Sequence, residues 1–212
     1  MAGNGIRCNV DRRFQWSAVI ALAFALLSFV VLSAAVGRGK TNGFDEACRT
    51  GLNSIASPAL TLVMQGVTTL GSQAALLGVS GFAVILLFLS RSWREGWLVV
   101  IAMAGAELLL AMLKLEFHRQ RPEPFFGAIA STSYSFPSGH TMLSFCCYGL
   151  LAAVASARLR GRARWWVRIG AAVLVLMIGI SRVYLGTHHA TDVIAGYLVA
   201  TVWLAALVAI AK

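Results

Sequence analysis

Apolar residues occur in six runs along this chain, each close to the roughly 20 residues that a helix needs to cross a bilayer. The run from Ser17 to Val36 contains no charged residue. It is longer than the apolar stretch of a signal peptide, which spans about 7–15 residues, so we interpret it as a retained span. The six predicted spans lie near residues 17–36, 72–90, 96–115, 138–157, 165–184 and 189–211.

The segments between these runs are more polar. Residues 37–57 contain four glycines and are predicted to form a polar loop. Pro58–Gly71 is only moderately apolar, which predicts a segment that lies at the membrane interface or re-enters the membrane. Residues 116–136 form a second predicted loop, which holds Pro122, Pro124 and a small serine and threonine cluster.

Composition agrees with a membrane protein. Hydrophobic residues make up 58% of the 212 positions and charged residues 12%, against about 25% charged residues in a soluble domain. The four cysteines show no disulfide or zinc spacing. We find no repeat, low-complexity tract or linker. The predicted fold is all-α, an integral membrane bundle of six transmembrane helices formed by a single domain over residues 1–212.

The net charge of +10 would fit nucleic-acid binding or membrane topology. The chain offers no soluble basic domain that could hold a duplex, so no nucleic-acid partner is expected. The N-terminal segment 1–16, the turn at 91–95, the stretch 158–168 and the C-terminus carry 11 of the 18 lysines and arginines. The other side carries 7, of which 3 belong to the motifs described below. Because cationic loops face the cytoplasm, both termini are predicted to be cytoplasmic.

Polar motifs lie at the predicted outer ends of three runs. In Pro137-Ser138-Gly139-His140, Ser138 is a favourable N-cap for the fourth span. A helix N-terminus offers free N–H groups to phosphate, and Gly139 lets the backbone approach an anion closely. His140 follows in the first turn. An ordinary capped helix with an interfacial histidine would give the same pattern.

A second motif joins the fifth and sixth spans. Arg182 ends the fifth span, and His188 and Asp192 open the sixth, four residues apart on one predicted helical face. Asp192 could accept the Nδ1 proton of His188, which would fix the tautomer and leave Nε2 free to attack. A structural Asp–His pair is the alternative, although a carboxylate this close to a bilayer is costly unless it is paired or functional.

The third motif follows the third span. Lys114, His118 and Arg121 are spaced four and three apart, which predicts one face of a helix that continues out of the span. Arg121 could bind phosphate as a fork and Lys114 as a point charge, whereas snorkelling cations are the ordinary alternative. His118 is interpreted as interfacial, and His189 is left outside the chemistry. Glu107, within the span, is interpreted as a neutral, hydrogen-bonded residue, with a polar path as the alternative.

Taken in order, these motifs resemble those of the type 2 phosphatidic acid phosphatase superfamily, Lys-x6-Arg-Pro, Pro-Ser-Gly-His and Ser-Arg-x5-His-x3-Asp. The sequence matches them from Lys114 to Pro122, from Pro137 to His140 and from Ser181 to Asp192. The resemblance covers about residues 17–211 and implies a six-helix membrane phosphatase.

The resemblance also implies a role for each matching residue. His188 would be the nucleophile and form a phosphohistidine, Asp192 would orient it, and His140 would protonate the leaving oxygen and later activate water. No metal or other cofactor would be needed, because positioned cations can stabilise the developing charge. The phosphate-binding residues would be Lys114, Arg121, Ser138, Gly139 and Arg182.

One departure from the family pattern follows His188. Many bacterial relatives have an aromatic residue and then proline there, and this chain has His189 and Ala190. The change leaves the implied catalytic set intact and would alter the entrance to the site. The motifs are also similar to those of vanadate-dependent haloperoxidases, but those proteins are soluble and six spans argue against one.

The predicted function is metal-independent dephosphorylation of a membrane lipid, with the site on the periplasmic face of the inner membrane. Undecaprenyl diphosphate is the first expected substrate, because an outward-facing site in a small enzyme suits recycling of a carrier lipid. Phosphatidylglycerophosphate, phosphatidic acid, diacylglycerol pyrophosphate and lipid A, by hydrolysis or by phosphate transfer, are alternatives. The loops at 37–57 and 123–136 are expected to hold the selectivity.

Two non-enzyme functions are also considered. An anion transporter should show internal repeats, and the sequence has none. A pseudoenzyme that only binds phospholipid should lack catalytic side chains, and all the expected ones are present. The sequence specifies no oligomeric state.

Overall fold

The computed structural model describes residues 4–126 and 132–210, with side chains from Val19 onward. Every regular element in these ranges is a helix. The elements are α1 Asn4–Gly37, α2 Asn42–Ser54, α3 Pro58–Leu70, α4 Gln73–Leu89, α5 Trp93–Phe117, α6 Gly139–Ser144, the π-helical segment η1 Phe145–Gly149, α7 Leu150–Ala157, α8 Ala163–Tyr184 and α9 Ala190–Ile210. The side chains of the N-terminal arginines that entered the charge count lie outside the described residues, as does Lys212.

Five helices in the described ranges are long and apolar enough to cross a membrane, namely α1, α5, the rod formed by α6, η1 and α7, α8 and α9. Helices α3 and α4 pass the same test only as a pair, and they are bent by 48° at their junction. The prediction of a multi-pass helical bundle is therefore confirmed. The sixth span depends on whether the bent pair crosses as one unit.

The bend between α3 and α4 follows from the local sequence. Ser72 is the N-cap of α4, and its Oγ accepts the N–H of Ala75 at 3.3 Å. Gly71 ends α3, and a Cβ there would lie 2.5 Å from a side-chain methyl carbon of Ile178 in α8. The segment predicted to lie at the interface or re-enter is thus helix α3, and the predicted span at 72–90 is α4.

Two local predictions are wrong. Residues 37–57 contain the 13-residue helix α2 rather than only a loop. Helix α5 ends at Phe117, because His118 adopts a left-handed conformation with φ of 46° and turns the chain. Lys114, His118 and Arg121 therefore do not share one helical face.

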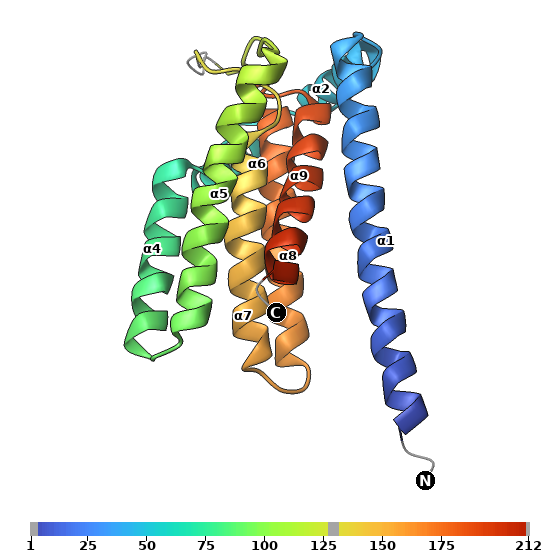
Figure 1. Ribbon diagram of the computed structural model, residues 1–212. Helices are drawn as coiled ribbons and strands as arrows, with labels where there is room; N and C mark the ends of the chain where they lie inside the picture. The colour runs from blue at the N-terminus through green and yellow to red at the C-terminus, as the bar shows by residue number, and fades with distance from the viewer. Residues whose placement is uncertain (1–3, 127–131, 211–212) are drawn as a thin grey trace.

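The bundle packs around α5, α9 and the α6–α7 rod. Their contact surface is lined by small and medium apolar side chains such as Ala106, Ala200 and Met142, all of which are fully buried. Helix α1 lies along α9 at one side of the bundle, and α4 lies against α5 at the other side (Figure 1). The short helix α2 lies across the end of the bundle where α1 ends and α9 begins (Figure 1). That end also holds the three motifs.

Candidate active site

His188 and Asp192 meet at the turn that begins α9. Nδ1 of His188 lies 3.3 Å from Oδ2 of Asp192, and both side chains are buried. Asp192 Oδ2 also accepts the backbone N–H of His189 at 2.9 Å, which satisfies a donor that the start of a helix leaves free. The predicted contact between the two residues is present. It arises from this capping turn, since His188 precedes the helix.

Arg121 occupies the other side of the His188 ring. Its Nη1 lies 3.1 Å from Nε2 of His188 and donates to the carbonyl of Thr187 at 3.1 Å. A guanidinium can only donate, so Nε2 accepts, and the ring proton lies on Nδ1 facing Asp192. This is the tautomer that the sequence analysis predicted.

Arg121 and Lys114 share an anchor in the segment before α6. Arg121 Nε donates to the Ser133 carbonyl at 2.8 Å and its Nη2 to the Ser133 hydroxyl at 2.9 Å. Lys114 Nζ lies 3.5 Å from the same hydroxyl. The two cations therefore lie close together although the helix predicted to align them ends at Phe117.

Arg182 approaches from α8. Its Nη1 donates to Thr68 Oγ1 of α3 at 2.8 Å, and its buried Nε has no hydrogen-bond partner among the described residues. His140 lies beside the bend between α3 and α4, because a Cβ on Gly71 would come within 3.2 Å of its ring. Arg182 and His140 thus complete the border of the site on the side of that bend.

The start of α6 is fastened to α9. The backbone N–H of Ser138 donates to the carbonyl of Asp192 at 3.0 Å, and its hydroxyl accepts from Thr141 at 3.0 Å. Ser138 occupies the N-cap position, but its side chain makes no capping hydrogen bond. The expected serine cap is therefore absent, and the Asp192 carbonyl holds the backbone of Ser138 itself. Gly139 fits tightly, since a Cβ there would lie 2.9 Å from a Leu110 methyl carbon.

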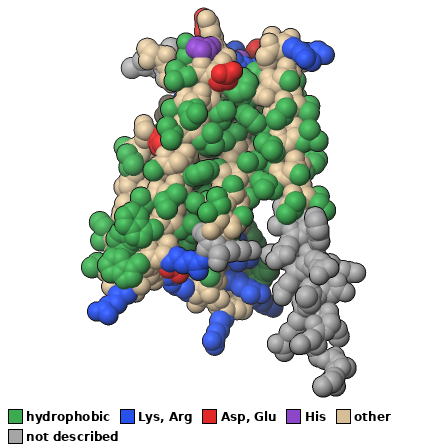
Figure 2. Space-filling view, viewed as in Figure 1, with side chains coloured by type: hydrophobic (Ala, Val, Ile, Leu, Met, Phe, Trp, Pro, Cys, Tyr) green, Lys and Arg blue, Asp and Glu red, His purple; other side chains and the backbone are tan. Residues whose placement is uncertain are grey.

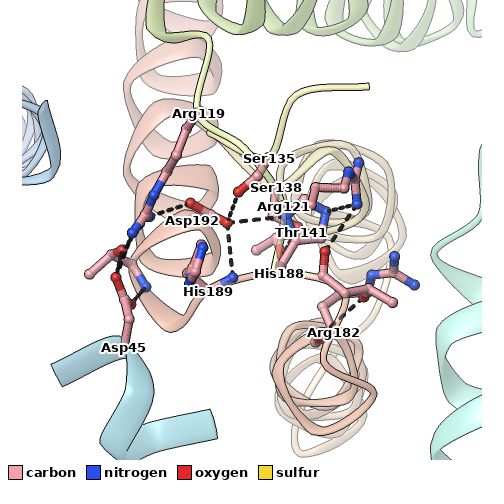
Figure 3. A network of polar contacts seen from close by, with 12 residues as sticks. Asp45, Arg119, Arg121, Ser135, Ser138, Thr141, Arg182, His188, His189 and Asp192 are labelled. Carbon is pink, nitrogen blue, oxygen red and sulfur yellow. Dashed lines mark hydrogen bonds and ion pairs between the residues drawn. The ribbon is translucent and has the colours of Figure 1, made fainter. Parts of the chain in front are cut away.

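The structure adds a buried network that the sequence analysis did not include. Arg119 Nη1 donates to Asp192 Oδ1 at 2.6 Å, and its Nη2 donates to Asp45 Oδ2 of α2 at 2.7 Å (Figure 3). The Ser135 hydroxyl donates to Asp192 Oδ2. Arg119 lies inside a motif stretch, which could have drawn attention to it. Asp45 lies in a segment predicted as a loop, and no sequence pattern indicated it.

The electrostatics favour an uncharged His188. Burial, followed by the nearby Arg121 and Arg182 cations, lowers the pKa of His188 from 6.5 to about 4, although Asp192 acts in the opposite direction. The ring is therefore neutral at pH 7 and can act as a nucleophile. No group of three or more His, Cys, Asp or Glu that could hold a metal ion occurs among residues 4–126 and 132–210.

The three residues with uncertain roles have definite places. Glu107 accepts from Gln73 Nε2 of α4 at 2.9 Å, so the hydrogen-bonded part of its interpretation is confirmed, and its neutral state stays a prediction. His118 is exposed, and its ring packs edge-on against Tyr134 with centroids 4.7 Å apart. His189 contributes its backbone N–H to Asp192.

A buried histidine–carboxylate pair thus lies beside lysine and arginine side chains at one end of an apolar helix bundle, an arrangement that is suited to binding a phosphate group at a membrane. The family model described as the PAP2 superfamily matches residues 95–212. Phosphatidylglycerophosphatase B of Bacillus subtilis (strain 168) is 35% identical over 173 residues, which cover 81% of this chain and 85% of that protein. The chain belongs to the PAP2 superfamily, and it is a multi-pass membrane lipid phosphate phosphatase.

More distant relatives agree with this assignment. The undecaprenyl-diphosphatase of Sulfolobus acidocaldarius is 25% identical over 199 residues, covering 92% of this chain and 89% of that protein. Among solved structures, the transmembrane PAP2-type phosphatidylglycerolphosphate phosphatase from Bacillus subtilis matches with a TM-score of 0.82 and 32% identity, over 89% of this chain and 94% of that chain. LpxE of Aquifex aeolicus matches with a TM-score of 0.61 and 22% identity, over 78% and 95% of the two chains, and shows the shared fold alone.

Proposed function

We propose that this chain hydrolyses a phosphate group from a membrane lipid through a phosphohistidine intermediate on His188. The observation that carries the proposal is the placing of the buried His188 ring between Asp192 at Nδ1 and Arg121 at Nε2. The neutral ring keeps its lone pair on Nε2. This atom faces the Arg121 guanidinium, whereas Nδ1 faces the Asp192 carboxylate. A phosphate that took the place of the contact between Arg121 and His188 would lie against the Nε2 nucleophile and could accept two hydrogen bonds from the Arg121 guanidinium.

In the first step Nε2 of His188 attacks the phosphorus, and the bond to the lipid oxygen breaks. His140, which takes up a proton once the bound phosphate offsets the charges of the surrounding cations, donates that proton to the leaving oxygen. The ring gains positive charge as the N–P bond forms, and Asp192 stabilises it. In the second step water attacks the phosphohistidine, His140 takes the proton, and phosphate leaves with His188 restored. Splitting the displacement into two steps lowers each barrier.

The phosphate would be held by Lys114, Arg121, Arg182, Ser138 and Gly139. The three cations come from three different parts of the fold, namely α5, the segment before α6 and α8, and would bind the anion together. Nε of Arg182 has no hydrogen-bond partner in the part of the chain that the structure describes, which supports this role, because a buried donor without an acceptor is costly unless a ligand supplies one. We propose that these donors neutralise the transferred phosphate without a metal ion or another cofactor.

We propose phosphatidylglycerophosphate as the first substrate, ahead of the undecaprenyl diphosphate that the sequence favoured. The relative that is 35% identical and the solved structure that matches with a TM-score of 0.82 are both named as phosphatases of this lipid, which supports the choice. Undecaprenyl diphosphate is the second candidate, supported by the name of a relative that is 25% identical over 92% of this chain. Both carry a terminal phosphate on a lipid that could enter from the bilayer.

We also propose that the chain forms one domain of six spans, with α3 and α4 crossing as one bent span. Lysine and arginine side chains gather at the end that carries the α4–α5 and α7–α8 turns, opposite the site (Figure 2). By the positive-inside rule, that end would face the cytoplasm and both termini would lie there. The site would then open on the extracytoplasmic face of the inner membrane.

The experiment is phosphate release by the purified protein in detergent with EDTA present. The panel holds phosphatidylglycerophosphate, undecaprenyl diphosphate, phosphatidic acid, diacylglycerol pyrophosphate and lipid A. His188→Ala should abolish release, whereas His118→Asn, which removes an exposed imidazole and tolerates the left-handed backbone there, should keep it. Full activity of the His188 variant would remove the proposed nucleophile. Activity that needs an added divalent ion would overturn the metal-free mechanism.

A further inference from the structure

Asp45 is a buried carboxylate that the proposed mechanism does not use. It lies in the first turn of α2 and is 1% exposed. Its Oδ1 accepts the backbone N–H of Thr191 at 2.9 Å, and its Oδ2 accepts the Thr191 hydroxyl at 2.8 Å. Burying a carboxylate is costly unless it is paired and hydrogen-bonded, so the fold needs these contacts to keep Asp45 buried. All of them are directed at the turn that begins α9.

Asp45 acts there as a cap supplied by another helix. The N–H of Thr191 belongs to the first turn of α9 and is one of the donors that a helix leaves without a partner. The residue at the N-cap position, His189, is half-buried and places no side-chain acceptor on this donor. Asp45 of α2 accepts it instead, across 146 positions of sequence.

Arg119 joins the two carboxylates. Its Nη2 lies 2.7 Å from Asp45 and its Nη1 lies 2.6 Å from Asp192. A planar guanidinium fixes the orientation of both partners, because its donors project in set directions. Asp45, Arg119, Asp192 and His188 thus form a row in which the first three residues alternate in charge and the neutral His188 ring, the nucleophile, stands at the end (Figure 3).

Within this row the two carboxylate oxygens of Asp192 have different partners. Oδ1 is held by Arg119, and Oδ2 is left for His188 Nδ1, the Ser135 hydroxyl and the N–H of His189. Without Arg119 the carboxylate could rotate about its terminal bond and present either oxygen. The guanidinium therefore fixes which oxygen His188 meets. Arg119 is not a further phosphate cation, since both its terminal nitrogens are engaged by Asp45, Asp192 and Thr191.

We propose that Asp45 and Arg119 are positioning residues for the hydrolysis, which hold Asp192 and, through it, the His188 ring. Helix α2 then contributes to the reaction by placing Asp45, in addition to packing on the end of the bundle. This inference rests on the proposed function, because it assigns the two residues to the nucleophile described there. Neither residue touches the phosphate. Their loss should lower the rate of the chemical step and leave phosphate binding in place.

The first experiment compares Asp45→Asn and Arg119→Lys with the control Glu46→Gln on phosphatidylglycerophosphate and undecaprenyl diphosphate. Glu46 neighbours Asp45 on α2, and its side chain is 60% exposed. Because a displacement of about 1 Å can cost about 10²-fold in rate, we expect kcat to fall by roughly 10²-fold in the first two variants, with KM within about threefold. The control should match the wild type. Rates within about threefold of wild type in both test variants would overturn the proposal.

A double-mutant cycle with Asp192→Asn separates positioning from folding. If Asp45 acts through Asp192, then Asp45→Asn should cost less than about threefold in kcat when Asp192 is already asparagine. An equal loss in both backgrounds would mean that Asp45 only supports the fold, and would overturn the proposal.

A third readout does not depend on turnover. The chain has four histidines, so selective ¹⁵N labelling gives four ring systems, and His188→Ala identifies the one of interest. We expect the ring ¹⁵N shifts of His188 to change in Asp45→Asn and Arg119→Lys and to stay unchanged in Glu46→Gln. If the wild type released no phosphate from any lipid while these shifts moved, the proposed function would fail and the positioning would stand. Unchanged shifts in both test variants would refute the positioning.

Discussion

Gly196 offers a sharp test of how closely the site depends on helix packing. It lies in α9 one turn after Asp192, at the place where α9 meets the start of α6. A Cβ at Gly196 would lie 2.9 Å from the Ser138 carbonyl oxygen, 3.1 Å from Thr141 Cβ and 3.3 Å from the Met142 nitrogen. None of these atoms can rotate away, because two belong to the backbone and the third is fixed to it.

Gly196→Ala must therefore move the helices apart. To bring the 2.9 Å contact to the 3.4 Å at which ordinary contact begins, α6 and α9 must separate locally by about 0.5 Å. The Ser138–Asp192 backbone hydrogen bond of 3.0 Å would lengthen with them. Since a 1 Å displacement costs about 10²-fold in rate, half of that distance should lower kcat by roughly tenfold.

The free energy of unfolding should fall by no more than about 2 kcal/mol, so the variant should still fold. Overpacking costs about 1–3 kcal/mol, whereas exchanging glycine for alanine inside a helix contributes about 1 kcal/mol in the other direction. The assay is kcat and KM for phosphate release, together with thermal unfolding in detergent. Gly170→Ala in α8 is the matched control, because nothing lies within 4 Å of its added Cβ. If Gly196→Ala kept the kcat of the wild type, close packing of α6 on α9 would not set the site geometry.

The remaining predictions concern the nucleophile and the anion site. Asp192→Asn should lower kcat by about 10⁴-fold, because an amide favours the wrong His188 tautomer, and a rate within tenfold of wild type in the phosphate-release assay would make Asp192 structural. Burial lowers the pKa of His188 to about 4, so an ¹⁵N titration should show its midpoint near pH 4 and lower still in Asp192→Asn, whereas a midpoint near 6.5 would contradict the buried site. The unfolded chain binds this proton at a higher pH than the folded chain does, so the contribution of His188 to the free energy of unfolding should fall as the pH decreases from 6.5 toward 4. Thermal unfolding of the wild type and of His188→Ala at several pH values measures this difference. Arg121→Lys should raise KM and lower kcat, each by roughly tenfold, because a lysine ammonium lacks the planar guanidinium that contacts Ser133 and His188 at the same time. Unchanged kcat and KM would exclude Arg121 from the phosphate site.

The sequence could predict the bundle and the end at which the motifs meet, because both depend on long-range regularities. Apolar runs of nearly bilayer length predict membrane helices, and each motif follows or precedes such a run. The contact between His188 and Asp192 was predictable for a local reason, since a spacing of four positions near a helix start brings two side chains together.

Helix α2 could not be predicted, because its pattern of burial is the reverse of the usual one. It buries Asp45, which is 1% exposed, and leaves its neighbour Phe44 53% exposed. Hydrophobic periodicity places an aromatic residue inward and a carboxylate outward, so it indicates the wrong face here. The true face is set by Arg119 and Thr191, whose nearness to Asp45 depends on the assembled fold.

The end of α5 shows a similar limit. A left-handed residue that ends a helix is usually glycine or asparagine, and here it is His118, so the sequence carried no stop signal at that place. The consequence reaches the site. Had α5 continued, Arg119 and Arg121 would have projected about 200° apart around one helix, two residues at 100° each. In the irregular segment after Phe117 they instead reach different partners, Arg119 the carboxylate of Asp192 and Arg121 the Nε2 of His188. The break after Phe117 is therefore what lets two neighbouring arginines hold the nucleophile and its carboxylate from separate sides.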